Sequence, residues 1–528
     1  MIELAPNVSI SVATDMPKQD VALRAARNAA PTSLSTKSPA RCWAFGVDAN
    51  CSVRQEDFLS ILGALPVHLE PEQLTKELVM PLIRCRFIAV FTFVIPVVLL
   101  SWAVSANAQQ ASTQVLSAED SDPNRLGWMQ GFPPAPERVI GQPDSNYFSF
   151  PKMRWTVCHF RELLPTKQVS RGLGAPVPLT YALDDAINDV TFTPIDGSES
   201  MSWQASLNEN YTDGLLILHQ GQVVYEVYSG CLDETGQHGA MSVTKSMTGL
   251  LGEILVAEGV LNEQVLVGDI LPELADSAFG NATVKQLLEM TTGLAYSEDY
   301  SDPNAEIWAY NAAASPLPKP DDYTGPRTYY EYLATVQPQG EHGQVFGYKT
   351  INTDALGWVI ARTTGESVAS LLSSRLWQRL GMEQDGYFTV DSIGTPFAGG
   401  GLSAGLRDMA RVGQLVLNEG RMNGEQLFPA AAVERIRQGG DRQAFAAADY
   451  RYLPGGSYRG MWWSLHNEHG AFAARGVHGQ TIYIDPTAEM VIVRFASHPM
   501  AGNAANDPTS LPAYQAVAEY LMEKAAKR

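Results

Sequence analysis

The sequence predicts an α+β fold, in which an antiparallel sheet is flanked by helices and carries a helical insert. Two hairpin-like segments, residues 214–228 and 481–495, enclose a long central region of helical patterns. Strands at both ends of a helical middle indicate that the two segments share one sheet. The chain is 45% hydrophobic, which is enough for a sizeable core.

Each predicted hairpin consists of two apolar runs separated by a short polar stretch. The runs are residues 214–218 and 223–228 in the first hairpin, and residues 481–484 and 490–495 in the second. The intervening stretches are His-Gln-Gly-Gln and Asp-Pro-Thr-Ala, whose residue types favour turns.

The central region contains several helical patterns. The strongest is residues 242–259, which are mostly apolar, include small residues and contain no proline, so they predict a buried helix. Residues 283–290 (TVKQLLEM) predict a short amphipathic helix. Further helices are expected at residues 353–365, 368–380, 407–418 and 511–527.

Composition excludes several classes of protein. The 528 residues include 37 Lys and Arg against 57 Asp and Glu, for a formal net charge of -20. An acidic surface repels phosphate backbones, so we expect no nucleic-acid partner. The chain has one long apolar run, which excludes a protein with several membrane spans.

That apolar run, residues 87–104, carries no charge and follows two arginines. It ends near Ala106-Asn107-Ala108, and this combination is typical of a signal peptide cleaved after Ala108. We interpret residues 80–108 as the signal peptide and residues 1–79 as a mis-called upstream extension. The expected location is periplasmic or secreted, with no membrane span after cleavage. A single transmembrane anchor is the alternative.

Two cysteines, Cys158 and Cys231, follow the expected cleavage site. They could pair in an oxidising compartment, but the sequence leaves their geometry open. Residues 109–200 are interpreted as a lead-in and the start of the main folded unit, and residues 201–528 as the domain that carries the motifs described below.

The clearest chemical signal is Ser242-Val243-Thr244-Lys245, at the start of the predicted buried helix. Residues three apart on a helix share a face, so the Lys245 amine can reach the Ser242 hydroxyl. A serine nucleophile needs such a base, and a lysine serves if burial lowers its pKa. The backbone N–H of Ser242, at a helix N-terminus, is suited to stabilise an oxyanion.

Further boxes accompany this tetrapeptide. Residues 286–294 read QLLEMTTGL, and Tyr348 stands in FGYKTINTDALGW. With these boxes, the chain from about residue 213 to 499 resembles the penicillin-recognising serine hydrolases. That group includes class C β-lactamases, D-alanyl-D-alanine carboxypeptidases, family VIII esterases and 6-aminohexanoate-dimer hydrolases. The resemblance implies a β-lactamase/DD-peptidase-like fold and a Tyr348 that shares the base role with Lys245.

The third box of the group is expected on the strand before TIYIDP. The resemblance assigns its glycine to Gly476 and a second oxyanion N–H to Val477, while a register using His478 and Gly479 is the alternative. The lysine that helps to hold a β-lactam carboxylate is missing from this box. The adjacent Arg475 is the one candidate to replace its charge.

The second box also departs from the usual Tyr-x-Asn, because Thr350 occupies the third position and Asn352 follows two residues later. Together with Gly-x-His-Gly-Gln in the third box, this is closer to the 6-aminohexanoate-dimer hydrolase branch. The resemblance therefore suggests Thr350, Asn352, Gly476 and His478 as substrate-binding residues.

Residues 297–344, rich in Pro, Tyr and Asp, are too long for a plain connection and are expected to form one wall of the cleft. Tyr300 and Trp308 in this loop are candidates to line the substrate site, with core packing as the alternative.

A second serine motif, Gly401-Leu402-Ser403-Ala404-Gly405, matches the nucleophile elbow of α/β-hydrolases. The elbow needs a preceding strand, and Pro396-Phe397-Ala398-Gly399-Gly400 is a poor one, so we interpret the motif as a glycine turn. The nine histidines do not show His-Glu-x-x-His spacing, and the glycines are not followed by Gly-Lys-Ser/Thr. We therefore expect no metal and no cofactor.

These observations lead to the hypothesis of an exported serine hydrolase that cleaves a small amide or ester through a Ser-Lys-Tyr acyl-enzyme mechanism. Two alternatives stay open. One is an enzyme of D-alanyl-D-alanine carboxypeptidase or β-lactamase type, and the other is a non-catalytic sensor of cell-wall peptides on the same scaffold. The sequence does not determine the oligomeric state.

Overall fold

The computed structural model describes residues 115–141, 146–300 and 302–527, which belong to one compact unit, Gln109–Arg528. The predicted upstream extension and signal peptide lie outside the described residues. No helix within the described ranges is long and apolar enough to cross a membrane.

An eight-stranded sheet forms the centre of the unit, in the strand order β12-β13-β14-β15-β16-β5-β6-β2. All neighbours are antiparallel except β2 and β6. The strands are β2 (Thr180–Tyr181), β5 (Thr212–His219), β6 (Gln222–Tyr228), β12 (Ser457–Arg459), β13 (Trp462–Ser464), β14 (Phe472–Gly476), β15 (Gln480–Asp485) and β16 (Met490–Ala496).

The two predicted hairpins are confirmed as β5–β6 and β15–β16. Strands β16 and β5 pair directly, with Val491 opposite Leu218, so the two distant halves of the chain share one sheet as predicted. Strands β12 and β13 were not predicted. Each has only three residues, too short for an alternating pattern to emerge from the sequence.

A smaller four-stranded sheet, in the order β1-β8-β9-β7, lies beside the nucleophile's helix. Its strands are β1 (Thr166–Val169), β7 (His238–Gly239), β8 (Gly386–Thr389) and β9 (Leu402–Ala404). The remaining strands form two short pairs, β3 (Thr191–Phe192) with β4 (Met201–Ser202) and β10 (Arg421–Met422) with β11 (Glu425–Gln426).

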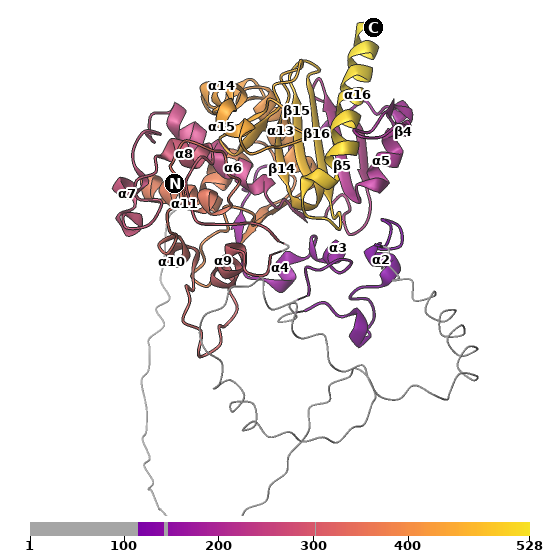
Figure 1. Ribbon diagram of the computed structural model, residues 1–528. Helices are drawn as coiled ribbons and strands as arrows, with labels where there is room; N and C mark the ends of the chain where they lie inside the picture. The colour runs from indigo at the N-terminus through magenta and orange to yellow at the C-terminus, as the bar shows by residue number, and fades with distance from the viewer. Residues whose placement is uncertain (1–114, 142–145, 301, 528) are drawn as a thin grey trace, which may run out of the picture. The chain divides into compact units, whose positions relative to one another are not determined.

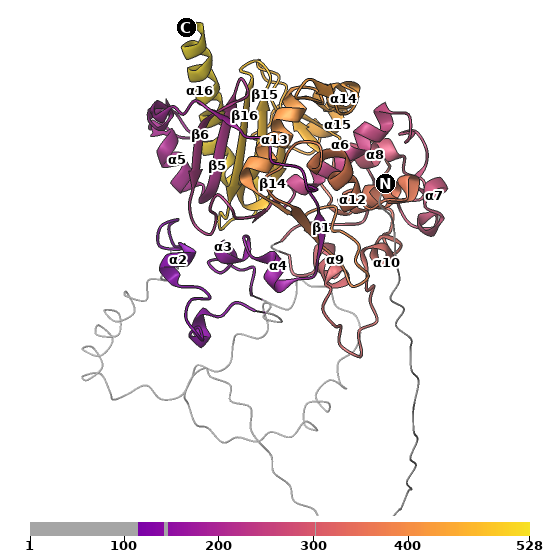
Figure 2. The same ribbon diagram turned by 180° about the vertical axis from the view of Figure 1, so that it is seen from behind.

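Helices cover both faces of the main sheet. On one face, α5 (Trp203–Glu209) and α16 (Asp507–Ala526) pack on Leu215 and Ile217 of β5. On the other face, α6 (Val243–Ala257) and α13 (Leu406–Leu417) share a large core with Leu216 and Leu218. Figure 1 shows α16 in front of the sheet, and Figure 2, from behind, shows α13 over the same strands.

The other helices are mostly short and lie largely in the insert between β7 and β12. They are α2 (Pro123–Leu126), α3 (Met153–Thr156), α4 (Phe160–Leu163), α7 (Val267–Ile270), α8 (Val284–Leu288), α9 (Glu306–Ala314), α10 (Tyr329–Leu333), α11 (Ile351–Thr364), α12 (Val368–Leu372), α14 (Ala431–Gln438) and α15 (Arg442–Ala446). The helix predicted over residues 368–380 is α12 followed by one π-helical turn, Ser373–Trp377.

Helix α6 is the buried helix that the sequence predicts. It is apolar on nearly all sides, and all its residues from Val243 to Leu255 are buried. Gly249 faces the turn between β12 and β13, where an added β-carbon would lie 1.9 Å from the Gly460 carbonyl oxygen. The small residues of α6 therefore allow this turn to cross the helix at close range.

The lead-in segment is attached firmly to the domain. Cys158 and Cys231 form a disulfide, which settles the pairing that the sequence leaves open. Nearby, Arg154 forms a buried ion pair with Asp213 at 3.0 Å. A disulfide restricts the unfolded chain, and a satisfied buried ion pair resists separation, so both features fix this segment beside the catalytic helix.

Candidate active site

Ser242 is the residue immediately before α6, and the fold presents its side chain half-buried at the helix N-terminus. The preceding residue, Met241, has a φ of 46°, in the left-handed region that non-glycine residues seldom adopt. Such strain persists where the surrounding structure enforces it, and it is typical of functional sites. The turn at Met241 directs the chain from β7 into α6.

Lys245 meets the geometric requirement for a base. Its Nζ lies 2.9 Å from Ser242 Oγ and donates to the Gly399 carbonyl oxygen at 2.6 Å. The side chain is 1% exposed. Burial lowers the pKa of the Lys245 amine to about 8, although the nearby Glu298 and Asp354 carboxylates oppose this shift. A large share of the amine is therefore neutral near pH 8 and able to accept the serine proton.

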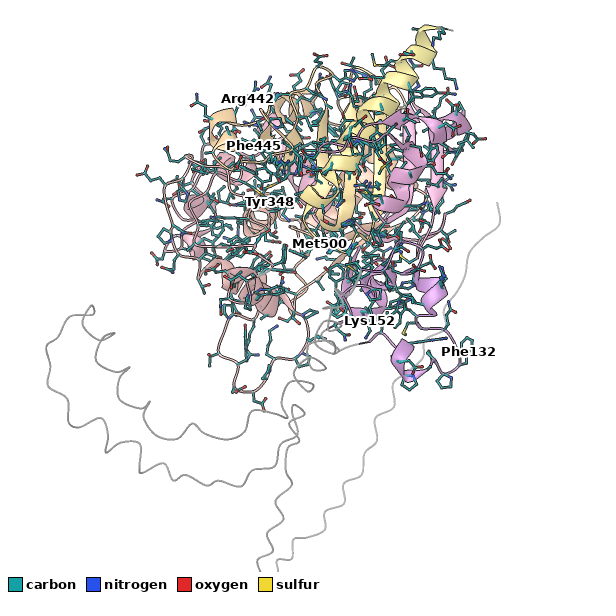
Figure 3. All side chains as sticks on the ribbon, turned by 45° about the vertical axis from the view of Figure 1, so that its right-hand side comes forward. Phe132, Lys152, Tyr348, Arg442, Phe445 and Met500 are labelled. Carbon is teal, nitrogen blue, oxygen red and sulfur yellow. A yellow bond between two sulfur atoms is a disulfide. The ribbon has the colours of Figure 1, made fainter. Side chains whose placement is uncertain are left out.

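Tyr348 completes the triad that the sequence predicts. Its ring centroid lies 5.1 Å from Lys245 Nζ, and the neighbouring Ser242 side chain lowers the pKa of its phenol, although by less than burial raises it. The ring stacks on Trp463 at 5.5 Å, which fixes its orientation. In Figure 3, Tyr348 lies below Arg442 and Phe445 of α15. Burial raises the pKa of Tyr348 well above its ordinary value, so the group is a neutral hydroxyl, which is the form able to relay a proton.

Strand β14 ends beside the nucleophile. An added β-carbon at Gly476 would lie 3.0 Å from both Ser242 N and Ala240 O, so a side chain at this position would crowd the Ser242 amide. The residue after it, Val477, follows the strand end as expected for the second oxyanion donor. In the alternative register, two residues later, His478 would take the place of Gly476 and Gly479 that of Val477, but it is Gly476 that lies against the Ser242 amide. The geometry favours Val477.

Two of the residues suggested as substrate contacts are buried inside the protein. Thr350 is buried, and its backbone N–H donates to the Glu298 carboxylate. Asn352 is fully buried, and its Oδ1 accepts from Thr292 Oγ1 at 2.6 Å. These contacts connect the start of α11 to the segment between α8 and α9. The two residues are therefore internal contacts and do not offer an open binding surface.

His478 is also mostly buried. Its Nδ1 lies 2.7 Å from the His498 carbonyl oxygen, and Phe148 packs edge-on against its ring. Burial lowers the pKa of His478 to about 4, so the imidazole is neutral at physiological pH. It has a φ of 63°, between β14 and β15, and it shapes the chain just after Val477.

Tyr300 and Trp308 are the two most accessible of the predicted substrate residues, at 46% and 42% exposure. Their rings pack edge to face at 6.2 Å, and Trp308 Nε1 donates to Asp302 O at 2.8 Å. The alternative of core packing does not hold for this pair. They form an exposed aromatic pair on the long loop, next to Glu298.

Sequence reasoning missed several site residues. Glu298 and Asp354 both act on the Lys245 amine, and Gly399 accepts its hydrogen bond. Tyr310 of α9 donates to Asp354 at 2.5 Å. Two signals were available in the sequence. Asp354 is an acidic residue inside the apolar pattern of α11, and Gly399 belongs to the run of glycines just before β9. Both became meaningful only when the fold brought these segments to Lys245.

The second serine motif is not a nucleophile elbow. Ser403 lies in the middle of β9, paired with Gly239 of β7 and Tyr387 of β8, and it is 1% exposed. Residues 402–404 are a strand, where a glycine turn was predicted; the turn precedes this strand, at residues 398–400, and Gly405 is the extended residue before α13. The expectation of a turn was wrong, but the rejection of Ser403 as a nucleophile agrees with its burial.

Arg475 does not replace the missing third-box lysine. It forms a buried ion pair with Asp507 of α16, and its guanidinium lies 5.4 Å from the Trp463 ring centroid. Since its charge is already neutralised, it is not available to hold a substrate carboxylate.

One cluster with metal-ligand spacing occurs among the described residues, namely Cys158, Cys231 and His238. Zinc and similar metals bind cysteine as the thiolate, and the disulfide leaves none at this cluster. The cluster is therefore not a metal centre in the disulfide form.

Comparison with known proteins agrees with this geometry. Residues 209–511 match the family model named Beta-lactamase. The chain is 34% identical over 366 residues to the 6-aminohexanoate-dimer hydrolase of Paenarthrobacter ureafaciens, covering 69% of this chain and 90% of that protein. A β-lactamase of Yersinia enterocolitica is 22% identical over 243 residues, covering 43% of this chain and 55% of that protein.

Among solved structures, a Bacillus anthracis protein described as a candidate 6-aminohexanoate-dimer hydrolase superposes with a TM-score of 0.66 and 31% identity. The match covers 74% of this chain and 99% of that one. The fold, the Ser242–Lys245–Tyr348 arrangement and these matches agree in one assignment. The chain belongs to the beta-lactamase family and is a serine hydrolase of that family.

Proposed function

We propose that the protein is an exported hydrolase that cleaves a small linear amide or ester through an acyl-enzyme on Ser242, similar in substrate class to 6-aminohexanoate-dimer hydrolases. The observation that carries the proposal is the 2.9 Å contact between Ser242 Oγ and a buried Lys245 amine with a lowered pKa. The relative from Paenarthrobacter ureafaciens, with its name and 34% identity, supports the amide specificity.

The proton path follows from the contacts. Ser242 Oγ attacks the substrate carbonyl carbon while its proton passes to neutral Lys245, and the Ser242 and Val477 amides stabilise the oxyanion. The tetrahedral intermediate collapses as the carbon–nitrogen or carbon–oxygen bond breaks, and the proton moves through the Tyr348 hydroxyl to the leaving group. Water then attacks the acyl-enzyme, returns a proton to Ser242 and releases the acid.

Substrate scope tests the proposal. We expect kcat/KM for p-nitrophenyl esters or aminohexanoate oligomers to exceed kcat/KM for nitrocefin, because the third-box lysine is missing and Arg475 is paired with Asp507. A panel that also includes D-alanyl-D-alanine peptides separates the alternatives. Nitrocefin or D-alanyl peptide turnover above that of the esters and amides would contradict the proposal. A stoichiometric burst without turnover on every substrate would indicate a sensor.

Export is the second part of the proposal. The disulfide between Cys158 and Cys231 supports it, because disulfides persist chiefly in oxidising compartments. We expect the mature protein from its native host to begin at Gln109, or at the pyroglutamate formed from it. Mass spectrometry of the N-terminal peptide measures this directly. An exported protein that retains residues 1–79 would contradict the assignment.

A further inference from the structure

Asp354 is a buried carboxylate next to the catalytic lysine, and the reaction scheme does not use it. It lies in the first turn of α11 and is 4% exposed. Its Oδ1 accepts from Gly399 N at 3.2 Å, and its Oδ2 accepts from the Tyr310 hydroxyl at 2.5 Å.

These donors are neutral, so they do not compensate the charge of the buried carboxylate. A buried carboxylate without a cation is costly, and such groups are usually paired. The cation here is Lys245, which donates to the carbonyl oxygen of the same residue, Gly399 O, at 2.6 Å. The amide and the carbonyl of Gly399 belong to successive peptide groups, so this one residue connects the carboxylate to the ammonium.

The lack of space around Gly399 supports its role as the residue between Asp354 and Lys245. An added β-carbon at Gly399 would lie 2.5 Å from Thr350 Cγ2 and 2.9 Å from Asp354 Oδ2. The 398–399 segment therefore packs directly on the first turn of α11. The Thr248 hydroxyl of the catalytic helix also donates to Ala398 O at 3.0 Å, so the segment is fixed from both sides.

We propose that Asp354 is a positioning residue that holds the Gly399 carbonyl against Lys245 and, as an anion, sets the basicity of the catalytic amine. The inference rests on the proposed function of Lys245 as the base. It assigns a role in the reaction to a group that does not touch the substrate.

The charges around the pair fix the direction of the effect. An anionic Asp354 stabilises the Lys245 ammonium and raises the lysine pKa, in the same direction as Glu298 and against burial. Tyr348 faces Lys245 from the other side as a neutral hydroxyl. Removal of the Asp354 charge should therefore lower the pKa of Lys245 further.

The Asp354 carboxyl titrates in a relevant range. Burial raises its pKa to about 7, while the hydrogen bond from Tyr310 and the charge of Lys245 oppose the shift. Tyr329 and Tyr330 also lie near it, and burial raises the pKa of both phenols, so they stay neutral. The same burial raises the pKa of Asp354 and lowers that of Lys245, so the two groups titrate close together.

The test is the Asp354→Asn variant of the full chain, which keeps the shape and removes the charge. The pKa of Lys245 is measured from the ¹³Cε shift of labelled lysine, assigned with Lys245→Met. We expect this pKa to fall by about half a unit to one unit. The shift is smaller than the shift that a directly contacting ion pair causes, because Gly399 lies between the two charged groups. The pH midpoint of fluorophosphonate labelling at Ser242 should move by the same amount.

Asp408→Asn is the matched control. Asp408 is also a buried helix carboxylate that accepts two backbone amides, from Glu383 and Gln384, but it pairs with Arg411 and not with Lys245. This variant should leave the Lys245 pKa unchanged. If Asp354→Asn does not fold, Tyr310→Phe serves instead, since the loss of its hydroxyl raises the Asp354 pKa and lowers that of Lys245 by a smaller amount.

An unchanged Lys245 pKa in a folded Asp354→Asn or Tyr310→Phe protein would overturn the inference and leave Asp354 a purely structural role. The NMR titration needs no substrate. A protein that shows the lysine shift but neither labels nor turns over any substrate would therefore contradict the proposed function and leave the coupling of Asp354 to Lys245 standing.

Discussion

Replacement of Ser242 by alanine is expected to abolish both turnover and covalent labelling by a fluorophosphonate probe. Ser242 is the hydroxyl whose Oγ lies 2.9 Å from a buried amine of lowered pKa, so its removal leaves the acyl group no acceptor. The thermal midpoint should stay nearly unchanged, because the side chain is only half-buried and contributes little packing. Intact-protein mass spectrometry and a thermal shift assay measure the two effects.

Ser403→Ala is the control for this experiment. Ser403 belongs to the second serine motif but lies inside β9 and is 1% exposed. The variant should keep the labelling of the unmodified protein. Loss of labelling in Ser403→Ala, together with its persistence in Ser242→Ala, would show that the nucleophile has been assigned wrongly.

Lys245→Ala and Tyr348→Phe are each expected to slow acylation by about 10²–10⁴-fold, the usual contribution of a positioned acid–base group. The double variant should lose less than the product of the two factors, because both residues move the same proton. Stopped-flow acylation with an activated ester measures each rate. Multiplicative losses would show that the two residues act independently.

The same measurements test the pH dependence. Lysine accepts a proton only when neutral, and the neutral fraction grows as the pH rises through its pKa. Because burial lowers the pKa of Lys245 to about 8, kcat/KM should rise with pH and level off above about 8. If kcat/KM instead rises only near the ordinary lysine pKa, the amine is solvated during the reaction.

Residues close together in the sequence were predictable. The spacing of Ser242 and Lys245 depends on one helical turn, and the apolar, proline-free pattern of α6 identifies that helix. The β5–β6 and β15–β16 hairpins are likewise local, since short polar turns join alternating or apolar runs. The resemblance of the boxes then located Tyr348, although no local rule connects it to Ser242.

Contacts between distant segments were decided only by the tertiary structure. Asp354 acts on Lys245 through Gly399, and Tyr310 reaches Asp354 from a loop expected to serve only as a cleft wall. The burial of Thr350 and Asn352, and the pairing of Arg475 with Asp507, likewise depend on which elements pack together.

The physical reason is the difference between local and non-local interactions. Helical spacing and turn chemistry act over a few residues and can be read directly from the order of side chains. Burial, pKa and ion pairing depend on neighbours more than a hundred residues away, such as Gly399 for Lys245. The sequence by itself predicted Ser242 as the nucleophile and Lys245 as its base, and the packing of α11 and the 398–399 segment decided the surroundings of that amine.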